Sequence, residues 1–276
     1  MLLTHESSDH FSNITFSTTS ANSANVLSPA LHNALAQRLR QLLSEPELLC
    51  QHLYSRLISI SDPAISEKRP VLPMADLALV YELRFTRNEF PEAFTSPTFA
   101  SQNPDADAAF SLSIDHALLK AMQMSPSALF AATARTMQQR HPVQISSMEE
   151  VLGFPAPSEP LLVVITTVES HHGAGAILYD GAAEQVAAIL GEFFILPSSI
   201  HEVLAVRRDA RLRICELKEL VQNINRQEVS PEDRLSDHVY KLIKNPTQDP
   251  AEPAYIFAFA DDYDTDYKDF CKEASP

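Results

Sequence analysis

The sequence has few of the residues that nucleotide-binding loops require. It has five glycines in 276 residues and contains neither a GxGxxG nor a GxxxxGKS/T pattern. Gly173 and Gly175 form a GxG pair without the third glycine of a dinucleotide-binding turn. This shortage argues against a Rossmann or P-loop enzyme, and we expect no cofactor.

Cysteines, long apolar runs and targeting signals are also scarce. The three cysteines, Cys50, Cys215 and Cys271, lie far apart and form no CxxC pattern. We therefore expect neither a disulfide framework nor a zinc site. No apolar run reaches the ~18 residues of a membrane span. The amino terminus lacks the basic and apolar segments of a secretory signal, so we predict a cytoplasmic protein.

Positive charge is in deficit, with 21 Lys and Arg against 36 Asp and Glu and a net charge of −15. Binding to nucleic acid or to anionic lipid requires a basic face. The sequence offers only a short basic patch, at Arg207, Arg208, Arg211 and Arg213. We therefore expect no nucleic-acid and no membrane partner, and a protein partner is left open.

Hydrophobic residues make up 45% of the chain, which is enough for one large folded domain or two smaller ones. Residues 1–25 are rich in Ser, Thr and Asn and predict a mobile arm. Three prolines within Phe154–Pro160 indicate a boundary between lobes. The predicted organisation is an arm (1–25), an N-terminal lobe (26–153), a C-terminal lobe (161–260) and an acidic tail (261–276).

Helical and strand patterns occur in both predicted lobes. Helices are expected from Pro29 and from Ser44 through Leu57, where leucines recur at helical spacing. Leu77–Phe85 alternates as a strand with one buried face would. In the second lobe the expected elements are strand Leu161–Val168, a turn at His171–Gly173, strand Ala174–Leu178, helix Ala182–Leu190, and strands Val239–Ile243 and Tyr255–Ala260.

These patterns predict an α+β fold with a mixed or antiparallel sheet and helices packed mainly on one face. An organisation in two α/β lobes is one alternative. Whether both halves share one sheet stays open.

Ionisable side chains that could act in catalysis or metal binding interrupt the apolar stretch Glu192–Arg208. His201 and Glu202 fall in an expected strand, Ile200–Val206, in which neighbouring side chains point to opposite faces. Because both faces are mainly apolar, at least one ionisable group there needs a polar partner or must become neutral. Such a pair is typical of a catalytic or metal site and also of a structural ion pair.

The remaining motifs favour structural interpretations. Ser198 and Ser199 follow a proline without the GxSxG pattern of a nucleophile elbow, so a turn is favoured over a nucleophile. His171 and His172 would need a third metal ligand from elsewhere, such as the Asp237–His238 pair. The tail from Asp262 matches part of a calcium loop, but Tyr267 stands where glycine is required. We expect no metal site.

Three blocks of the sequence carry a family resemblance. They read LSIDHALLKAMQMSPSALFAATARTMQQRHPVQISSMEEVLG, GAGAILYDGAAEQVAAILGEFFILPSSIHEVLAVRRD and LVQNINRQEVSPEDRLSDHVYKL. Through them the chain resembles an uncharacterised bacterial family, a domain of unknown function common in anaerobic Gram-positive gut bacteria. The resemblance runs from about Ser111 onward, which is a little over half of the chain, and implies no activity, cofactor or catalytic residue.

The same blocks contain polar residues in apolar surroundings. They are Ser198, Ser199, His201, Glu202, Asn225, Asp237 and His238. We predict that the Asp237–His238 segment folds against Ser199–Glu202 to form one polar cluster. The leading functional hypothesis is a non-enzymatic binding or interaction module. The alternative is a hydrolase or metal-dependent enzyme centred on His201, Glu202 and His238, and a third interpretation is a scaffold.

Overall fold

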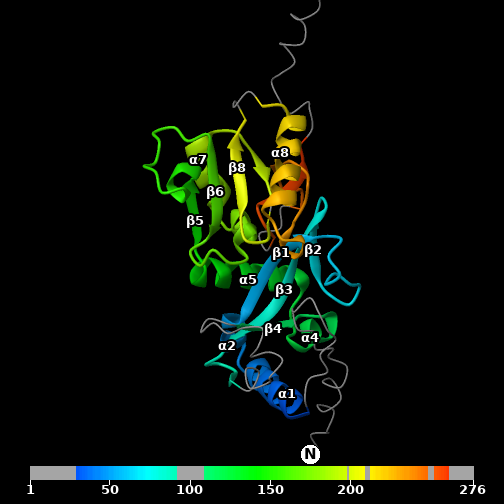
Figure 1. Ribbon diagram of the computed structural model, residues 1–276. Coiled ribbons are helices and arrows are strands. Elements are labelled where there is room, and N and C mark those ends of the chain that lie inside the picture. Colours follow the sequence, from blue (N-terminus) through cyan, green and yellow to red (C-terminus); the bar gives the residue numbers. More distant parts are fainter. Residues whose placement is uncertain (1–28, 92–108, 198, 209–211, 248–251, 261–276) are drawn as a thin grey trace, which may run out of the picture. The chain divides into compact units, whose positions relative to one another are not determined.

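The computed structural model describes residues 29–91, 109–197, 199–208, 212–247 and 252–260 (Figure 1). Contacts group the chain into two compact units. Unit 1 contains Met1–Ser55, Ser66–Pro70 and Tyr81–Thr136, and unit 2 contains Arg56–Ile65, Val71–Val80 and Met137–Pro276. The predicted α+β class with antiparallel sheets is confirmed. None of the helices in the described part of the chain has the length and apolar character that crossing a membrane requires.

Unit 1 is mainly helical. It contains α1 (Pro29–Ser44), α2 (Pro46–Gln51), β4 (Ala109–Ser113), α4 (His116–Ala121) and most of α5 (Pro126–Arg140). The leucines of α1 are buried at helical spacing, as predicted, including Leu35 and Leu39 at 0% exposure. Asp115 begins α4 as an N-cap, because its carboxylate accepts the Leu118 N–H at 2.7 Å.

A four-stranded sheet has the order β1-β3-β2, with β4 paired to β3. Its strands are β1 (Leu53–Ser59), β2 (Val71–Met74), β3 (Leu77–Thr86) and β4. The prediction that β3 buries one face is wrong, since Ala78 and Val80 are as buried as Leu77 and Leu79. Glu82 is also buried on this strand, 3.8 Å from the Arg69 guanidinium. A charged residue that is paired this way breaks the alternation without facing water.

The helix predicted from Ser44 through Leu57 is too long, because β1 begins at Leu53. Leu49, Leu53 and Leu57 are four residues apart, and that spacing fits both a helix and one face of a strand. Tyr54 and Ile58 are buried as well, so both faces of β1 are packed. Leucine spacing alone did not distinguish the two structures.

Unit 2 contains a six-stranded sheet with the order β10-β9-β7-β8-β6-β5, in which every pairing is antiparallel. Its strands are β5 (Val143–Ser147), β6 (Leu162–Thr167), β7 (Phe193–Leu196), β8 (Val203–Arg207), β9 (Tyr240–Lys244) and β10 (Tyr255–Phe259). The predicted strands near Val239 and Tyr255 are therefore present and pair with each other.

Helices cover both faces of this sheet. On one face, Leu204 and Val206 pack against α8 (Ile214–Gln227) through Leu217 and Val221. Figure 1 shows α8 in front of the strands. The alternate residues point the other way, and Val203 and Ala205 there are at 0% exposure. α7 (Ala182–Leu190) and η2 (Gly173–Leu178) contact β8 and account for that second buried face.

The chain before the proline-rich segment already contributes to unit 2. β5 pairs with β6 along its length, and α6 (Met148–Val151) follows it with a capping box formed by Ser147 and Glu150. The sequence pattern places these residues in the first lobe and indicates no strand at Val143–Ser147. The VQISS segment is short and only weakly apolar, so it forms a strand because it pairs with the strongly apolar β6.

Two local predictions in unit 2 are wrong. Gly173–Leu178 forms a 3-10 helix instead of the second strand of a hairpin. β8 begins at Val203, so His201 and Glu202 lie before the strand instead of on its opposite faces. The Ser199 hydroxyl accepts the N–H groups of both residues, at 3.1 and 3.3 Å, and this local turn replaces ladder pairing there.

Gly173 explains why η2 packs so closely on the sheet. Its N–H donates to the His201 carbonyl at 2.9 Å. A Cβ at this position would lie 2.5 Å from the Thr167 nitrogen and 2.8 Å from the His201 carbonyl oxygen. Both obstacles are backbone atoms, which cannot rotate away. Only glycine permits this approach.

We expect Gly173→Ala to lower the free energy of unfolding by about 3 kcal/mol because the Cβ forces backbone shifts. The matched control is Gly175→Ala in the same 3-10 helix, where the nearest atom to a new Cβ is Leu79 Cδ2 at 3.5 Å. That variant should be neutral or stabilising by up to about 1 kcal/mol. Urea unfolding measures both, and equal stability of the two variants would contradict the packing argument.

Candidate functional site

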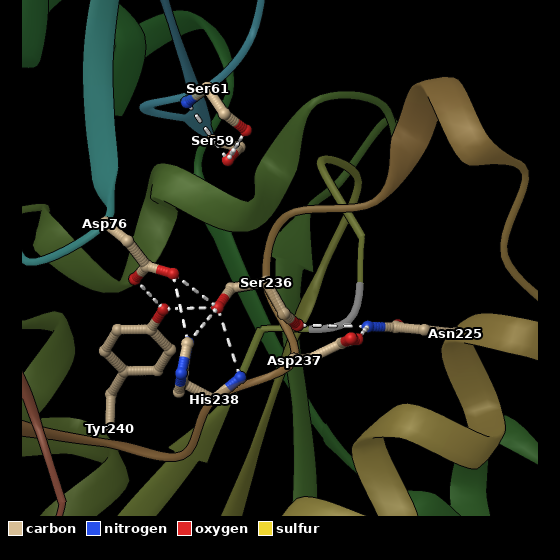
Figure 2. Close-up of polar contacts among 8 residues, drawn as sticks. All are labelled: Ser59, Ser61, Asp76, Asn225, Ser236, Asp237, His238 and Tyr240. Atoms are coloured by element: carbon tan, nitrogen blue, oxygen red, sulfur yellow. Dashed lines mark hydrogen bonds and ion pairs between the residues drawn. The ribbon is translucent and has the colours of Figure 1, made fainter.

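The Asp76 carboxylate, in the turn between β2 and β3, is hydrogen-bonded to polar side chains just before β9 and at its start. We call Asp76, Ser236, His238 and Tyr240 the Asp76 cluster (Figure 2). Asp76 follows Ala75, whose φ of 54° turns the chain sharply. The Ile60 N–H donates to the Asp76 carbonyl at 2.8 Å and holds the turn. The carboxylate is thus placed by backbone contacts and is free to bind through both oxygens.

Three side chains bond to the Asp76 carboxylate. The Ser236 hydroxyl donates to Oδ2 at 2.9 Å, and His238 Nδ1 lies 3.1 Å from the same oxygen. The Tyr240 hydroxyl donates to Oδ1. Figure 2 shows the three groups converging on the carboxylate from one segment of the chain. Such a network orders each of its members.

Tyr240 is the buried member of the Asp76 cluster. It is at 0% exposure, and its ring lies 5.7 Å from the ring of Phe257. Burial, and then the hydrogen bond to the Asp76 carboxylate, raise the pKa of Tyr240 well above its usual range. The phenol therefore stays protonated and acts as a fixed donor.

His238 is the accessible member, with 44% of its side chain exposed. Because a carboxylate only accepts hydrogen bonds, Nδ1 carries the proton in the neutral ring and Nε2 has the lone pair. The Phe259 ring lies 4.9 Å from the imidazole at an edge-to-face angle. A carboxylate-oriented imidazole with a basic Nε2 is the arrangement of a general base.

Ser236 does not complete a nucleophilic triad. Its hydroxyl accepts the His238 N–H at 3.1 Å and also lies 3.1 Å from His238 Nδ1, the same nitrogen that faces Asp76. A Ser-His-Asp triad uses the two ring nitrogens for different partners. Ser236 therefore fixes the turn before β9 and positions the carboxylate.

Asn225 and Asp237 meet beside this cluster. Asn225 lies on α8 with 2% exposure. Its amide donates to Asp237 Oδ1 at 2.7 Å and to the Ser236 carbonyl at 3.0 Å. These bonds tie α8 to the segment that carries His238. Both residues have a structural role here.

His201 belongs to a second group, which we call the His201 cluster: His171, His172, His201 and Asp233. The His172 and His201 rings stack at 5.5 Å with an interplanar angle of 8°. His201 Nδ1 accepts the His172 N–H at 3.2 Å, and Nε2 lies 3.6 Å from Asp233 Oδ1. His172 has a φ of 51°, an uncommon conformation for a residue with a side chain.

The polar residues selected from sequence thus have different partners. Ser199 pairs with Arg234 in an isolated bridge and bonds the N–H groups of His201 and Glu202, whereas His238 binds Asp76. Ser198 and the calcium-like tail lie outside the described residues. Within the described ranges, no group of three or more His, Cys, Asp or Glu side chains is arranged to hold a metal ion.

Sequence reasoning missed Asp76, Tyr240 and Asp233. Asp76 is 162 residues from His238, and a lone aspartate in a hairpin turn is typical of solvent-facing turns. Tyr240 was read only as part of an apolar strand. The one available signal was the SDHVY run, in which Ser236, His238 and Tyr240 alternate and so reach the same side of the chain.

We expect Tyr240→Phe to lower the free energy of unfolding at pH 7 by about 1–3 kcal/mol, because it removes a buried donor to a carboxylate. Because its pKa is raised, Tyr240 stays protonated in the folded state at pH values where the unfolded chain has lost this proton. The contribution of the Tyr240 hydroxyl to the free energy of unfolding is therefore complete below the ordinary tyrosine pKa of 10.0. It is lost as pH rises above that value, by up to about 1.4 kcal/mol per pH unit.

Urea unfolding between pH 9 and 11.5 measures this slope. Wild-type protein should lose stability more steeply than Tyr240→Phe above pH 10. Ser236→Ala is the control, because it retains the phenol and should keep the steep slope. Equal slopes for wild type and Tyr240→Phe would show that Tyr240 does not titrate as described.

Comparison with known proteins gives a family without a known activity. Residues 32–244 match the sequence profile described as a family of unknown function, DUF5688. The match extends further toward the amino terminus than the three blocks that carried the resemblance. Neither the curated proteins nor the solved structures that were searched gave a match. The matched range is well over half of the chain, and the protein belongs to the family of unknown function DUF5688.

Proposed function

We propose that this protein is a non-enzymatic binding module that recognises a protein partner through an apolar loop. The loop, residues 151–161, is called the Phe154 loop. It carries Val151, Leu152, Phe154 and Leu161 at 55%, 64%, 63% and 56% exposure. Large apolar side chains gathered at one exposed place are characteristic of interaction sites. This concentration is the observation that carries the proposal.

The Phe154 loop is held in place by polar contacts. Arg207 Nη2 donates to the Pro160 carbonyl at 2.9 Å. At the other end, the Phe154 N–H donates to the Glu149 carbonyl at 2.8 Å, directly after the capped helix α6. Fixed ends lower the entropy lost on binding.

The charges beside the loop define the partner's chemistry. Glu149, Glu150 and Glu159 flank the apolar side chains, and the chain has a net charge of −15. Complementary charge speeds association and excludes acidic partners. The partner segment is therefore apolar and flanked by Lys or Arg. Burying one Phe or Leu side chain in the complex supplies about 1.5–3 kcal/mol.

Selection of 15-residue peptides from a random display library tests this recognition. Peptides selected on the full chain should combine apolar residues with flanking Lys or Arg. Their affinity should fall at least about tenfold for the Leu152→Asp/Phe154→Asp variant, because two apolar contacts are lost. The control is Ile189→Asp/Leu220→Asp, which alters two exposed residues on α7 and α8. Equal losses in both variants, or selected peptides without this pattern, would refute the proposal.

A second candidate function, acid–base hydrolysis, is favoured by one observation. The Asp76 carboxylate contacts His238 through Nδ1, and 44% of the His238 side chain is exposed. A base fixed in this way can activate water for attack on an ester or amide. The alternative enzyme that we considered from sequence was centred on His201, Glu202 and His238. In this candidate, His238 acts with Asp76 and not with the other two.

Hydrolysis of p-nitrophenyl acetate by purified protein tests this second function. If it holds, His238→Gln abolishes turnover above the background, and Asp76→Asn lowers it by about 10²–10⁴-fold. His116→Gln, an exposed histidine at the start of α4, is the control and should retain full activity. Turnover that persists in His238→Gln would exclude His238 as the base.

A further inference from the structure

Unit 2 contains a cleft of about 510 Å³ between α7 and the strands β7, β9 and β10. The polar and aromatic side chains along it are Glu184, Glu192, Phe193, Phe194, Arg208, Lys241 and Tyr255. The volume suits a small molecule. The cleft involves neither the Phe154 loop nor the Asp76 cluster, so a ligand here would be a separate activity of the protein.

The cleft is open because α7 presents small residues to it. Ala183 and Ala187 line the helix side, and Gly191 closes the helix with a φ of 73°. A Cβ at Gly191 would meet no atom within 4 Å. Larger side chains at these positions would fill the space. The sequence therefore leaves room for a ligand against the sheet.

Arg208 provides the first cationic group. Its Nη1 lies 2.8 Å from Glu192 Oε2. Its Nε is buried, and within the described part of the chain it has no hydrogen-bond partner. The guanidinium carbon lies 6.0 Å from the Phe194 ring centroid. The Arg208 guanidinium lines the cleft, and its planar set of N–H groups suits a ligand carboxylate. Lys241 adds a second positive charge to the lining.

Two carboxylates also line the cleft. Glu184, on α7, is close enough to Tyr255 on β10 for its charge to act on the phenol. Burial, and then the charge of this carboxylate, raise the pKa of Tyr255. Glu192 is 74% exposed at the rim. An anionic ligand would be repelled by these groups and a cationic one by Arg208 and Lys241, so neither matches the whole cleft.

We infer that this cleft binds a small zwitterion with an apolar side chain, of the class of apolar amino acids and their short peptides. The ligand carboxylate faces Arg208 and Lys241, and the ligand ammonium faces Glu184 and Glu192. Phe193, Tyr255 and Leu242 are half-buried, and they offer the apolar surface that the side chain requires.

Calorimetric titration of the full chain with four probes tests the inference. The probes are L-phenylalanine, L-phenylalanyl-L-leucine, N-acetyl-L-phenylalanine and L-phenylalaninamide. One or both zwitterions should bind, which separates the free amino acid from the peptide. Removing the ammonium or the carboxylate should weaken binding at least about tenfold, because each loses a charge-assisted contact. Absence of binding by both zwitterions at 10 mM would overturn the inference.

A pair of arginine variants locates the binding. Arg208→Gln should weaken binding of the zwitterion at least about tenfold and should leave the weak binding of phenylalaninamide unchanged, since that probe has no carboxylate. Arg226→Gln, on α8 and bonded to Asn223, should bind the zwitterion as wild type does. Unfolding by urea checks that both variants fold. Equal binding by the two variants would place the ligand elsewhere and overturn the inference.

Discussion

The Asp76 carboxylate is the interaction on which much of unit 2 depends. It lies in a hairpin turn, yet it accepts from groups at the start of β9, and β9 continues into the six-stranded sheet. The Tyr240 hydroxyl donates a hydrogen bond to this carboxylate, and the Tyr240 backbone pairs with Ile195 of β7. One polar contact thus connects a turn, a strand register and a buried aromatic ring. The Asp76 side chain is 29% exposed, and these hydrogen bonds replace the water contacts that its carboxylate loses on folding.

Much of the fold could be predicted from the sequence where local chemistry was unambiguous. The helix from Pro29 and the helix at Ala182–Leu190 both follow from apolar residues that recur at helical spacing within one segment. The 3-10 helix at Gly173 could not be predicted, since a short apolar run fits a strand equally well. Its conformation is decided by the close approach of Gly173 to β6 and to His201, a contact between segments that are distant in sequence.

The candidate site was predicted only in part for the same reason. His238, Asp237 and Asn225 were selected because they lie in apolar surroundings, and the structure places Asn225 and Asp237 in contact. The partner of His238 is Asp76, which no local pattern distinguishes from an ordinary turn residue. His201 was selected as a residue on an apolar strand, whereas it lies before β8 and contacts His172 and Asp233 from other segments. Local sequence patterns do not show which distant residues folding brings together, and Asp76 was missed for that reason.

The six-stranded sheet ends at β5, and this edge bears on aggregation. An exposed edge strand can pair with another chain and seed a growing sheet. β5 has only five residues, with Pro142 before it and the capped helix α6 after it. Proline has no N–H to donate, and a helix cannot extend the ladder. The β5 edge is therefore too short for long pairing, and the exposed apolar residues of the Phe154 loop can follow it closely in the chain without this edge becoming a template for fibres.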